Sequence, residues 1–546
     1  SEHQVMMRRP GLLLCRRRRS TRRPPPQRRR WFSSSSVPSS YGLLRPFPGF
    51  EETATDRIVP PTPRAEVTTL ASGLRVVSQE TYTYMSAIGA VVEAGSAMEW
   101  PSTQGAALLT EALAWSGSLK RSQAEMLRSF DEMGGYLHCN AQREQILYCV
   151  DVLRERADDA TELLAETMLL PDYKSGGLDA KELLAMSRES QTQDQRVKEM
   201  ILTAAYGRDS ALGAPLYSEH ASVDDAARFR ADWFTPKNIV LAGTGIDHSD
   251  LVSFAETYFE PYLPPPNSAN AADKEKQEKK SSSLSAYRPG IVTEEAALPD
   301  VPGFAKEAEE KVRVAVAAEA DWGWHSPDLV VLSVLQTLLG GGDSFSAGGP
   351  GKGMYSRLYR ETLNSYHWID AAEAFCVVHQ GTSLLGISGS CKPIDAAALT
   401  ELFVLELRRL KDTPVSLEEL DRAKNMLKNN VLTQLESRLV LFEDLARQFA
   451  TFGRRQPLHQ MVSLIDAVTQ DDIMRLGSNL CTQPPAVAAH GPDLSKIPDH
   501  KHLAELLLDG PDGLSTASRF RFFPSTRAAS VVAQEQRKTK NTTTSE

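Results

Sequence analysis

The sequence predicts an α+β protein built from two homologous domains, each a mixed β-sheet with helices packed on it. A strand pattern occurs twice: AVVEA at 90–94 is echoed by AVAAEA at 315–320, which aligns Glu93 with Glu319 at an offset of 226 residues. The same offset places the helical segment 105–115 over the apolar stretch 331–341. A low-complexity segment rich in proline, lysine and serine, 264–285, lies between the copies. It cannot bury enough apolar surface to fold, so the domains are joined by a flexible linker.

Local patterns predict the elements of each domain. Ser122, followed three residues later by Glu125, is a capping-box signature for a helix that the Gly134-Gly135 pair ends. In the second domain, Ser416 and Glu419 have the same spacing and predict a long helix towards Phe452. The remaining predicted elements are strands over 74–78, 88–93, 238–245 and 312–318, a strand pair over 136–150, and helices over 101–115, 154–170, 178–206, 248–259 and 331–341.

Length and composition are those of a globular protein with more than one domain. A chain of 546 residues is too long for a single compact core. Hydrophobic residues make up 41% and charged residues 24%, and no run of eighteen apolar residues predicts a transmembrane segment. The six cysteines are scattered without a CxxC pair, which indicates reduced structural thiols.

The N-terminus differs in charge from the rest of the chain. Residues 1–50 contain twelve arginines and one acid, Glu2, so their net charge is +11, which leaves −20 for residues 51–546. An arginine- and serine-rich segment almost free of acids has the composition of a mitochondrial presequence, which predicts a location in the mitochondrial matrix. The segment Arg30-Trp31-Phe32 resembles a cleavage pattern that predicts removal after Phe32. Two alternatives are a nucleic-acid-binding arm and a functionless extension before Met6 or Met7; nothing downstream is basic or aromatic enough to extend a nucleic-acid surface.

The predicted organisation follows from these boundaries. It comprises a presequence at 1–32, an N-terminal extension at 33–64, a first domain at 65–263, a linker at 264–286, a second domain at 287–512 and a disordered tail at 513–546.

Four stretches resemble the N-terminal half of the pitrilysin-type zinc peptidases. They are LASGLRVVSQ at 70–79, VVEAGSAME at 91–99, DEMGGYLHCNAQREQILY at 131–148 and NIVLAGTG at 238–245. The resemblance implies a helix that carries H-x-x-E-H in active members. There, two histidines on one helical face bind zinc, the glutamate activates the bound water, and a distant glutamate is the third ligand.

In this chain the corresponding helix is QGAALLTEALAWSGS, 104–118. The two histidine positions hold Leu108 and Ala112, the general-base position holds Glu111, and Glu189 stands where the distal glutamate is expected. A zinc site needs three protein ligands, so we expect neither a catalytic residue nor a metal in this chain. The eleven histidines include no i, i+4 pair that could substitute. Glu111 and Glu189 are then either relics at a polar wall or acidic contacts for a basic peptide.

The glycine-rich segment 340–353 is the second candidate site. It holds seven of the 34 glycines. A phosphate-binding loop would need glycine at 346 and Ser or Thr at 353, where Ser346 and Gly353 stand. A surface loop without a role is a further alternative. Interleaved Phe345, Lys352 and Met354 instead favour a loop whose glycine backbone approaches an extended ligand while apolar side chains anchor it.

The whole segment GGGDSFSAGGPGKGMYSRLY, 340–359, resembles the loop of the alpha subunits of the mitochondrial processing peptidase family, with Asp343 where a further glycine is frequent. The resemblance implies a non-catalytic subunit that binds basic presequence peptides and forms a clamshell-like heterodimer with a homologous, zinc-bearing beta subunit. It implies no nucleic-acid partner and leaves peripheral inner-membrane association open. Its implied binding residues are Gly340, Gly341, Gly342, Ser344, Phe345, Gly348, Gly349, Gly351, Lys352, Gly353 and Met354.

Two other functions are compatible with such a fold. A structural core subunit of the mitochondrial cytochrome reductase complex is the main alternative, although such a subunit is not expected to keep GGPGKGMYSRLY. An independently active peptidase is opposed by Leu108 and Ala112.

Overall fold

The computed structural model describes residues 64–173, 179–218, 221–263, 285–296, 311–320, 323–343 and 354–509. Residues 1–61 and 62–546 are separate units, and all of the described residues belong to the second unit. The predicted presequence, its cleavage position after Phe32 and the tail at 513–546 lie outside the described ranges, as do nearly all of 33–64 and 264–286. None of the described helices is long and apolar enough to cross a membrane.

The first half of the chain forms a six-stranded mixed sheet. Its strand order is β1-β2-β6-β3-β5-β4, with β2 and β6 parallel and the other neighbours antiparallel. The strands are β1 (Ala65–Thr69), β2 (Arg75–Gln79), β3 (Met85–Val92), β4 (Tyr136–Ala141), β5 (Ile146–Leu153) and β6 (Ile239–Thr244).

The second half repeats this topology. Its order is β7-β12-β8-β11-β10-β9, and again a single pair is parallel: β7 with β12, which corresponds to β2 with β6 of the first sheet. Five strands match those of the first sheet one for one, which confirms the two homologous sheets predicted from the repeat. The strands are β7 (Ile291–Glu295), β8 (Val312–Glu319), β9 (Gly341–Asp343), β10 (Ile369–Val378), β11 (Ser383–Cys391) and β12 (Ala486–Gly491).

Strand β9 has no counterpart in the first sheet and was not predicted. It pairs with β10. In the first sheet β4 occupies the position of β10, and β4 is the edge strand there. The glycine-rich segment therefore begins as an added edge strand of the second sheet.

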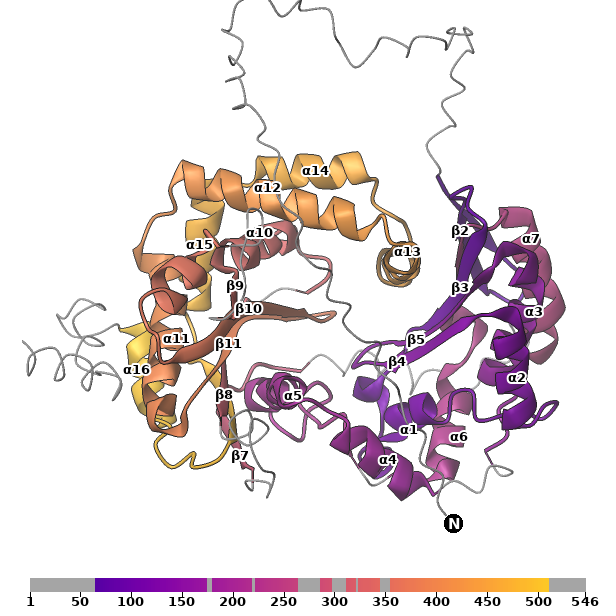
Figure 1. The fold of residues 1–546 in the computed structure, drawn as a ribbon, viewed down its shortest axis with the longest axis horizontal. Coiled ribbons are helices and arrows are strands. Elements are labelled where there is room, and N and C mark those ends of the chain that lie inside the picture. Colours follow the sequence, from indigo (N-terminus) through magenta and orange to yellow (C-terminus); the bar gives the residue numbers. More distant parts are fainter. Residues whose placement is uncertain are drawn as a thin grey trace, which may run out of the picture. The chain divides into compact units, whose positions relative to one another are not determined.

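Helices pack on both sheets (Figure 1). In the first half they are α1 (Ala106–Ala112), α2 (Gln123–Met133), α3 (Ala157–Leu169), α4 (Ala180–Glu189), α5 (Gln193–Tyr206), α6 (Val223–Trp233) and α7 (His248–Phe254). In the second half they are α10 (Leu329–Leu339), α11 (Ala396–Asp412), α12 (Leu417–Gln434), α13 (Arg438–Phe452), α14 (Leu458–Ala467), α15 (Gln470–Leu480) and α16 (His500–Leu508).

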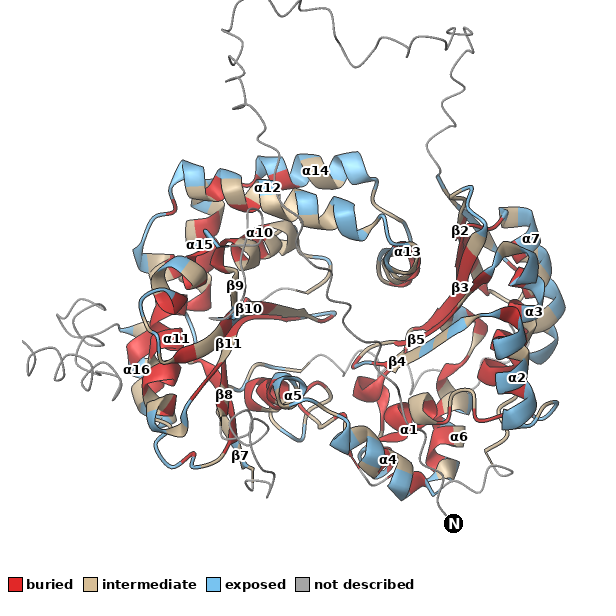
Figure 2. Ribbon diagram, in the orientation of Figure 1, coloured by how far each residue is buried: buried red, intermediate tan, exposed pale blue. Residues whose placement is uncertain are grey.

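Each half contributes one helix to the other half's sheet. Helix α5 packs on β8 and β12 of the second sheet, and α13 packs on β3 and β6 of the first (Figure 1). Phe442 and Leu445 of α13 are buried against apolar residues of the first sheet. Because the central strands are covered on both faces, they are almost continuously buried (Figure 2) and are largely apolar in sequence.

Three predicted helices are shorter than expected. The helix over 101–115 is regular only at Ala106–Ala112, because Gly105 and Trp115 both have positive φ. The helix over 178–206 is two helices, since Thr192 and Gln195 form a capping box that starts α5. The helix from Ser416 to Phe452 is likewise divided, and α13 starts afresh after Ser437. Because of the last two breaks, α5 and α13 are separate helices, and each packs on the other half's sheet.

Candidate functional site

Helix α1, which would carry the zinc motif, is positioned by the preceding VEAGSAME segment. Glu99 accepts hydrogen bonds from the backbone N–H of Gly105 at 2.9 Å and of Ala107 at 2.7 Å. A carboxylate at this point satisfies donors that the first helical turn leaves unpaired and complements the helix dipole. Gly105 has φ +97°, and a Cβ there would lie 2.4 Å from the carbonyl oxygen of Ser218.

The three motif positions lie on α1 without the donors that zinc needs. Leu108 is 3% exposed and belongs to the core of the first half. Glu111 accepts the backbone N–H of Ala141, at the end of β4, at 2.6 Å. Burial raises the pKa of Glu111, and the Ala141 hydrogen bond partly opposes this effect. Ala112 offers no ligand atom. The carboxylate of Glu111 links α1 to β4 through its hydrogen bond with the Ala141 amide.

Neighbouring side chains do not restore a metal site. Burial, reinforced by the nearby charge of Glu111, raises the pKa of Cys139 well above its ordinary value, which disfavours the thiolate that metal binding requires. Glu189, the predicted distal position, is the last residue of α4 and is exposed. Among the described residues no cluster of three or more His, Cys, Asp or Glu could hold a metal ion. The residues present do not fit zinc.

The structure describes both ends of the glycine-rich loop. Gly340, Gly341 and Gly342 lead into it, and Met354 follows it. The other predicted binding residues, Ser344, Phe345, Gly348, Gly349, Gly351, Lys352 and Gly353, lie outside the described residues.

The outgoing end is a backbone path that requires glycine. Gly340 follows α10 with φ +56°, and a Cβ on it would lie 2.4 Å from the Cβ of Ser356. Gly341 has φ +118° and pairs with Glu373 of β10, where a Cβ would lie 2.0 Å from the carbonyl oxygen of Ala372. Side chains do not fit at either position, which explains why the helix gives way directly to glycines.

The returning end is fixed by two buried polar residues. Ser356 accepts the backbone N–H of Gly341 at 3.1 Å, so the two ends of the loop are joined at its base. Arg357 is 6% exposed and donates to both carboxylate oxygens of Glu419, at 2.7 and 3.2 Å. We call these four residues, Gly341, Ser356, Arg357 and Glu419, the loop base.

Sequence reasoning missed the role of Glu419. The spacing from Ser416 predicts a capping box, and Ser416 does accept the N–H of Glu419 at 3.2 Å. The Glu419 carboxylate is directed instead to Arg357. In α2, by contrast, the carboxylate of Glu125 returns to the N–H of its cap residue Ser122 at 2.9 Å. The sequence signal for this pair was Arg357, which comes shortly after the glycine-rich segment 340–353.

Directly before Ser356, the returning end of the loop exposes large apolar side chains. Met354 is 36% and Tyr355 66% exposed, and the guanidinium of Arg422 lies 5.5 Å from the Tyr355 ring. Lys198 of α5 reaches across to Glu373, the β10 partner of Gly341, at 2.8 Å. The strand that pairs with Gly341 of the loop base is thus linked to a helix of the first half.

Comparisons with known proteins agree with this architecture. The family described as Insulinase (Peptidase family M16) matches residues 75–219, and the one described as Peptidase M16 inactive domain matches residues 220–427. A probable mitochondrial-processing peptidase subunit alpha-1 from Arabidopsis thaliana is 32% identical over 446 residues, which are 80% of this chain and 83% of that protein. The chain belongs to peptidase family M16, in the group of mitochondrial-processing peptidase alpha subunits. The Homo sapiens alpha subunit is also 32% identical, over 82% of this chain and 85% of its own length.

A solved structure shares the fold of this M16 chain. A chain of "Complex III2 from Candida albicans, Inz-5 bound" superposes with a TM-score of 0.64 at 18% identity, covering 81% of this chain and 99% of that one. At this identity the likeness concerns the fold alone.

Proposed function

We propose that this chain is the substrate-recognising, non-catalytic subunit of a mitochondrial processing peptidase, located in the matrix. It binds basic presequences of imported proteins and presents them to a homologous beta subunit that holds the catalytic zinc. The observation that carries the proposal is the state of α1: Leu108 is buried in the core, Ala112 has no ligand atom, and Glu111 is engaged by the Ala141 amide. The alpha-subunit names of the relatives support the same assignment.

Substrate binding is assigned to the glycine-rich loop. Its base is fixed by Ser356 and by the buried Arg357–Glu419 pair, whereas five of the fourteen residues between Gly341 and Ser356 are glycine. A fixed base with a permissive backbone suits an extended peptide, because glycine allows close approach while Met354 and Phe345 supply apolar contacts. The net charge of −20 over residues 51–546 favours the capture of basic peptides, more strongly at low salt.

A cleavage assay tests the proposal. The chain is purified with a beta subunit, and presequence cleavage is measured for each subunit alone and for the pair. We expect cleavage only with the beta subunit present, and a strong gain on adding this chain. Replacing the glycines of 342–353 with alanine, with Gly341 kept, should slow processing while the pair still forms. Stoichiometric zinc binding or cleavage by the isolated chain would contradict the assignment.

A second candidate function is that of a structural core subunit of the cytochrome reductase complex. The observation in its favour is the fold match to a chain of a Complex III2 structure. Purification from mitochondria distinguishes the two. If the chain is recovered only with respiratory complexes, and loss of 341–353 leaves cleavage unchanged, the structural role is correct.

A further inference from the structure

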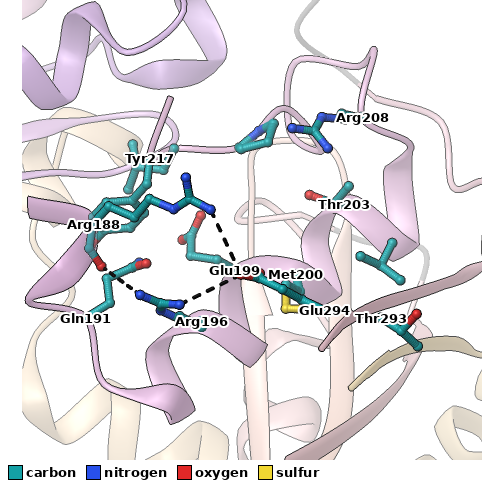
Figure 3. Close-up of a pocket in the computed structure, with 13 residues that line it drawn as sticks. Arg188, Gln191, Arg196, Glu199, Met200, Thr203, Arg208, Tyr217, Thr293 and Glu294 are labelled. Carbon is teal, nitrogen blue, oxygen red and sulfur yellow. Dashed lines mark hydrogen bonds and ion pairs between the residues drawn. The ribbon is translucent and has the colours of Figure 1, made fainter. Parts of the chain in front are cut away.

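A cavity of about 390 Å³ lies within the described part of the chain, between α4, α5, the loop after α5 and the edge strand β7 (Figure 3). Arg188 reaches it from α4, Arg196 and Glu199 from α5, and Glu294 from β7. A volume of this size accommodates a small organic molecule. None of the residues assigned above to presequence binding lines it.

The negative charge of Glu199 is balanced by an arginine that lies outside the cavity. Its carboxylate receives a hydrogen bond from the guanidinium of Arg143 at 2.7 Å. The Arg143 side chain is 5% exposed, is also held by the carbonyl of Leu212 and the hydroxyl of Ser96, and does not line the cavity. Glu199 therefore has its counter-charge without the help of the cavity arginines.

The cavity arginines outnumber the remaining acid. Glu294 lies 3.7 Å from a nitrogen of Arg196 and 3.9 Å from one of Arg188, distances too long for hydrogen bonds (Figure 3). Arg208 also lines the cavity, is exposed, and forms no ion pair with a described residue. Even without Arg188, which has a further partner, Arg196 and Arg208 are two guanidinium groups against the one remaining carboxylate, that of Glu294, so the cavity lining has an excess of positive charge.

A buried histidine adds unsatisfied hydrogen-bonding capacity beside Glu294. His490 of β12 is the register partner of Glu294 and is 3% exposed. Neither of its ring nitrogens finds a hydrogen-bond partner among the described residues. Buried polar groups are rarely left without a partner, so His490 marks this end of the sheet as polar, although it does not itself line the cavity.

We propose that the cavity binds a small organic anion that carries carboxylate or phosphate groups. Guanidinium groups bind both kinds of oxyanion through paired, charge-assisted hydrogen bonds. Met200 and Leu216, which also line the cavity, contact the carbon skeleton of the ligand. A basic presequence is repelled by the same arginines, so the site does not rest on the proposed function.

Isothermal titration calorimetry on the full chain tests this site. The probes are citrate, pyrophosphate and inorganic phosphate, each at constant ionic strength, with sodium chloride as the baseline. We expect saturable binding of citrate or of pyrophosphate, and the stronger probe identifies which acidic group the site prefers. Arg196→Gln and Arg208→Gln should each weaken that binding by about tenfold or more.

The control is Arg156→Gln, which removes an equal charge from an exposed arginine that does not line the cavity. It should leave binding unchanged. Arg208 is exposed, so its replacement is expected to preserve the fold and keep the test informative even if Arg196→Gln unfolds. Binding no stronger than that of chloride, or equal weakening by Arg208→Gln and Arg156→Gln, would overturn the proposal.

Discussion

One residue in each candidate region has a local role that the structure explains: Glu111 on α1 and Gly341 at the glycine-rich loop. On α1, a half-buried carboxylate, that of Glu111, stands between the two histidine positions that hold Leu108 and Ala112, and it accepts a hydrogen bond from the end of β4. At the loop, Gly341 occupies a backbone position that no larger residue can take. Each residue leads to a separate test.

Replacing Glu111 with glutamine should stabilise the protein at neutral pH. Because burial raises the pKa of Glu111 in the folded state, folding is penalised once the carboxyl ionises, and this penalty appears as pH rises above the unfolded pKa of 4.5. Glutamine keeps an oxygen for the Ala141 amide but carries no charge. Urea unfolding at pH 7.5 should show a gain of about 1 kcal/mol that disappears near pH 4. A loss of stability at pH 7.5 would mean that the charge is needed.

Replacing Gly341 with alanine should be far more damaging than replacing Gly342. Alanine at 341 combines φ +118° with a Cβ that would lie 2.0 Å from a backbone oxygen, whereas a Cβ at Gly342, φ +156°, meets nothing within 4 Å. We expect Gly342→Ala to cost about 1–2 kcal/mol of backbone strain and Gly341→Ala about 3 kcal/mol or more. Thermal unfolding of the two variants measures the difference. Equal costs would show that the backbone around Gly341 shifts to admit a Cβ.

Secondary-structure elements show what the sequence could and could not predict. The Ser122–Glu125 cap, the Gly134 stop and the repeated strand and helix at 226 residues all depend on local spacing, and the structure confirms them. The break before α5 has a local signal, the capping-box spacing of Thr192 and Gln195, which the sequence prediction overlooked. The surfaces on which α5 and α13 pack belong to the other half's sheet and are far away in the sequence, so local spacing could not show where either helix packs. The same reason hid the Arg357–Glu419 pair, whose members are 62 residues apart.

The loop base should depend on the buried ion pair as a unit. Arg357→Met leaves Glu419 largely buried without its partner, since that side chain is only 15% exposed, and should cost about 3 kcal/mol. Arg357→Lys keeps the charge but loses the two-point contact, so its cost should be intermediate. In the double variant Arg357→Met/Glu419→Gln, part of the loss should be recovered. A double-mutant cycle from urea unfolding gives the coupling, and strict additivity would contradict a shared role.

At the scale of the whole molecule, the crossed helices tie the two halves together. Helix α13 is held on the first sheet by buried Phe442 and by a two-point ion pair between Arg438 and Asp151, at 2.8 and 2.6 Å. Helix α5 is buried against the second sheet in return. Gly89 of β3 makes room for the Phe442 ring, because a Cβ there would lie 2.6 Å from it. The association of the halves is therefore built into their packing and does not need the linker between them.

This packing predicts that the chain can be divided in the linker without falling apart. Co-expressed fragments 33–270 and 278–546 should purify together and elute from a sizing column at the volume of the undivided protein. Phe442→Ala in the second fragment should weaken the association, since losing a buried aromatic ring costs about 3–5 kcal/mol. Val440→Ala on the same helix is the matched control, because Val440 is 38% exposed. Two results would contradict this prediction: separate elution of the wild-type fragments, or equal stability of Phe442→Ala and Val440→Ala in the undivided chain. Either would mean that the covalent connection, and not the packing of α5 and α13, holds the halves together.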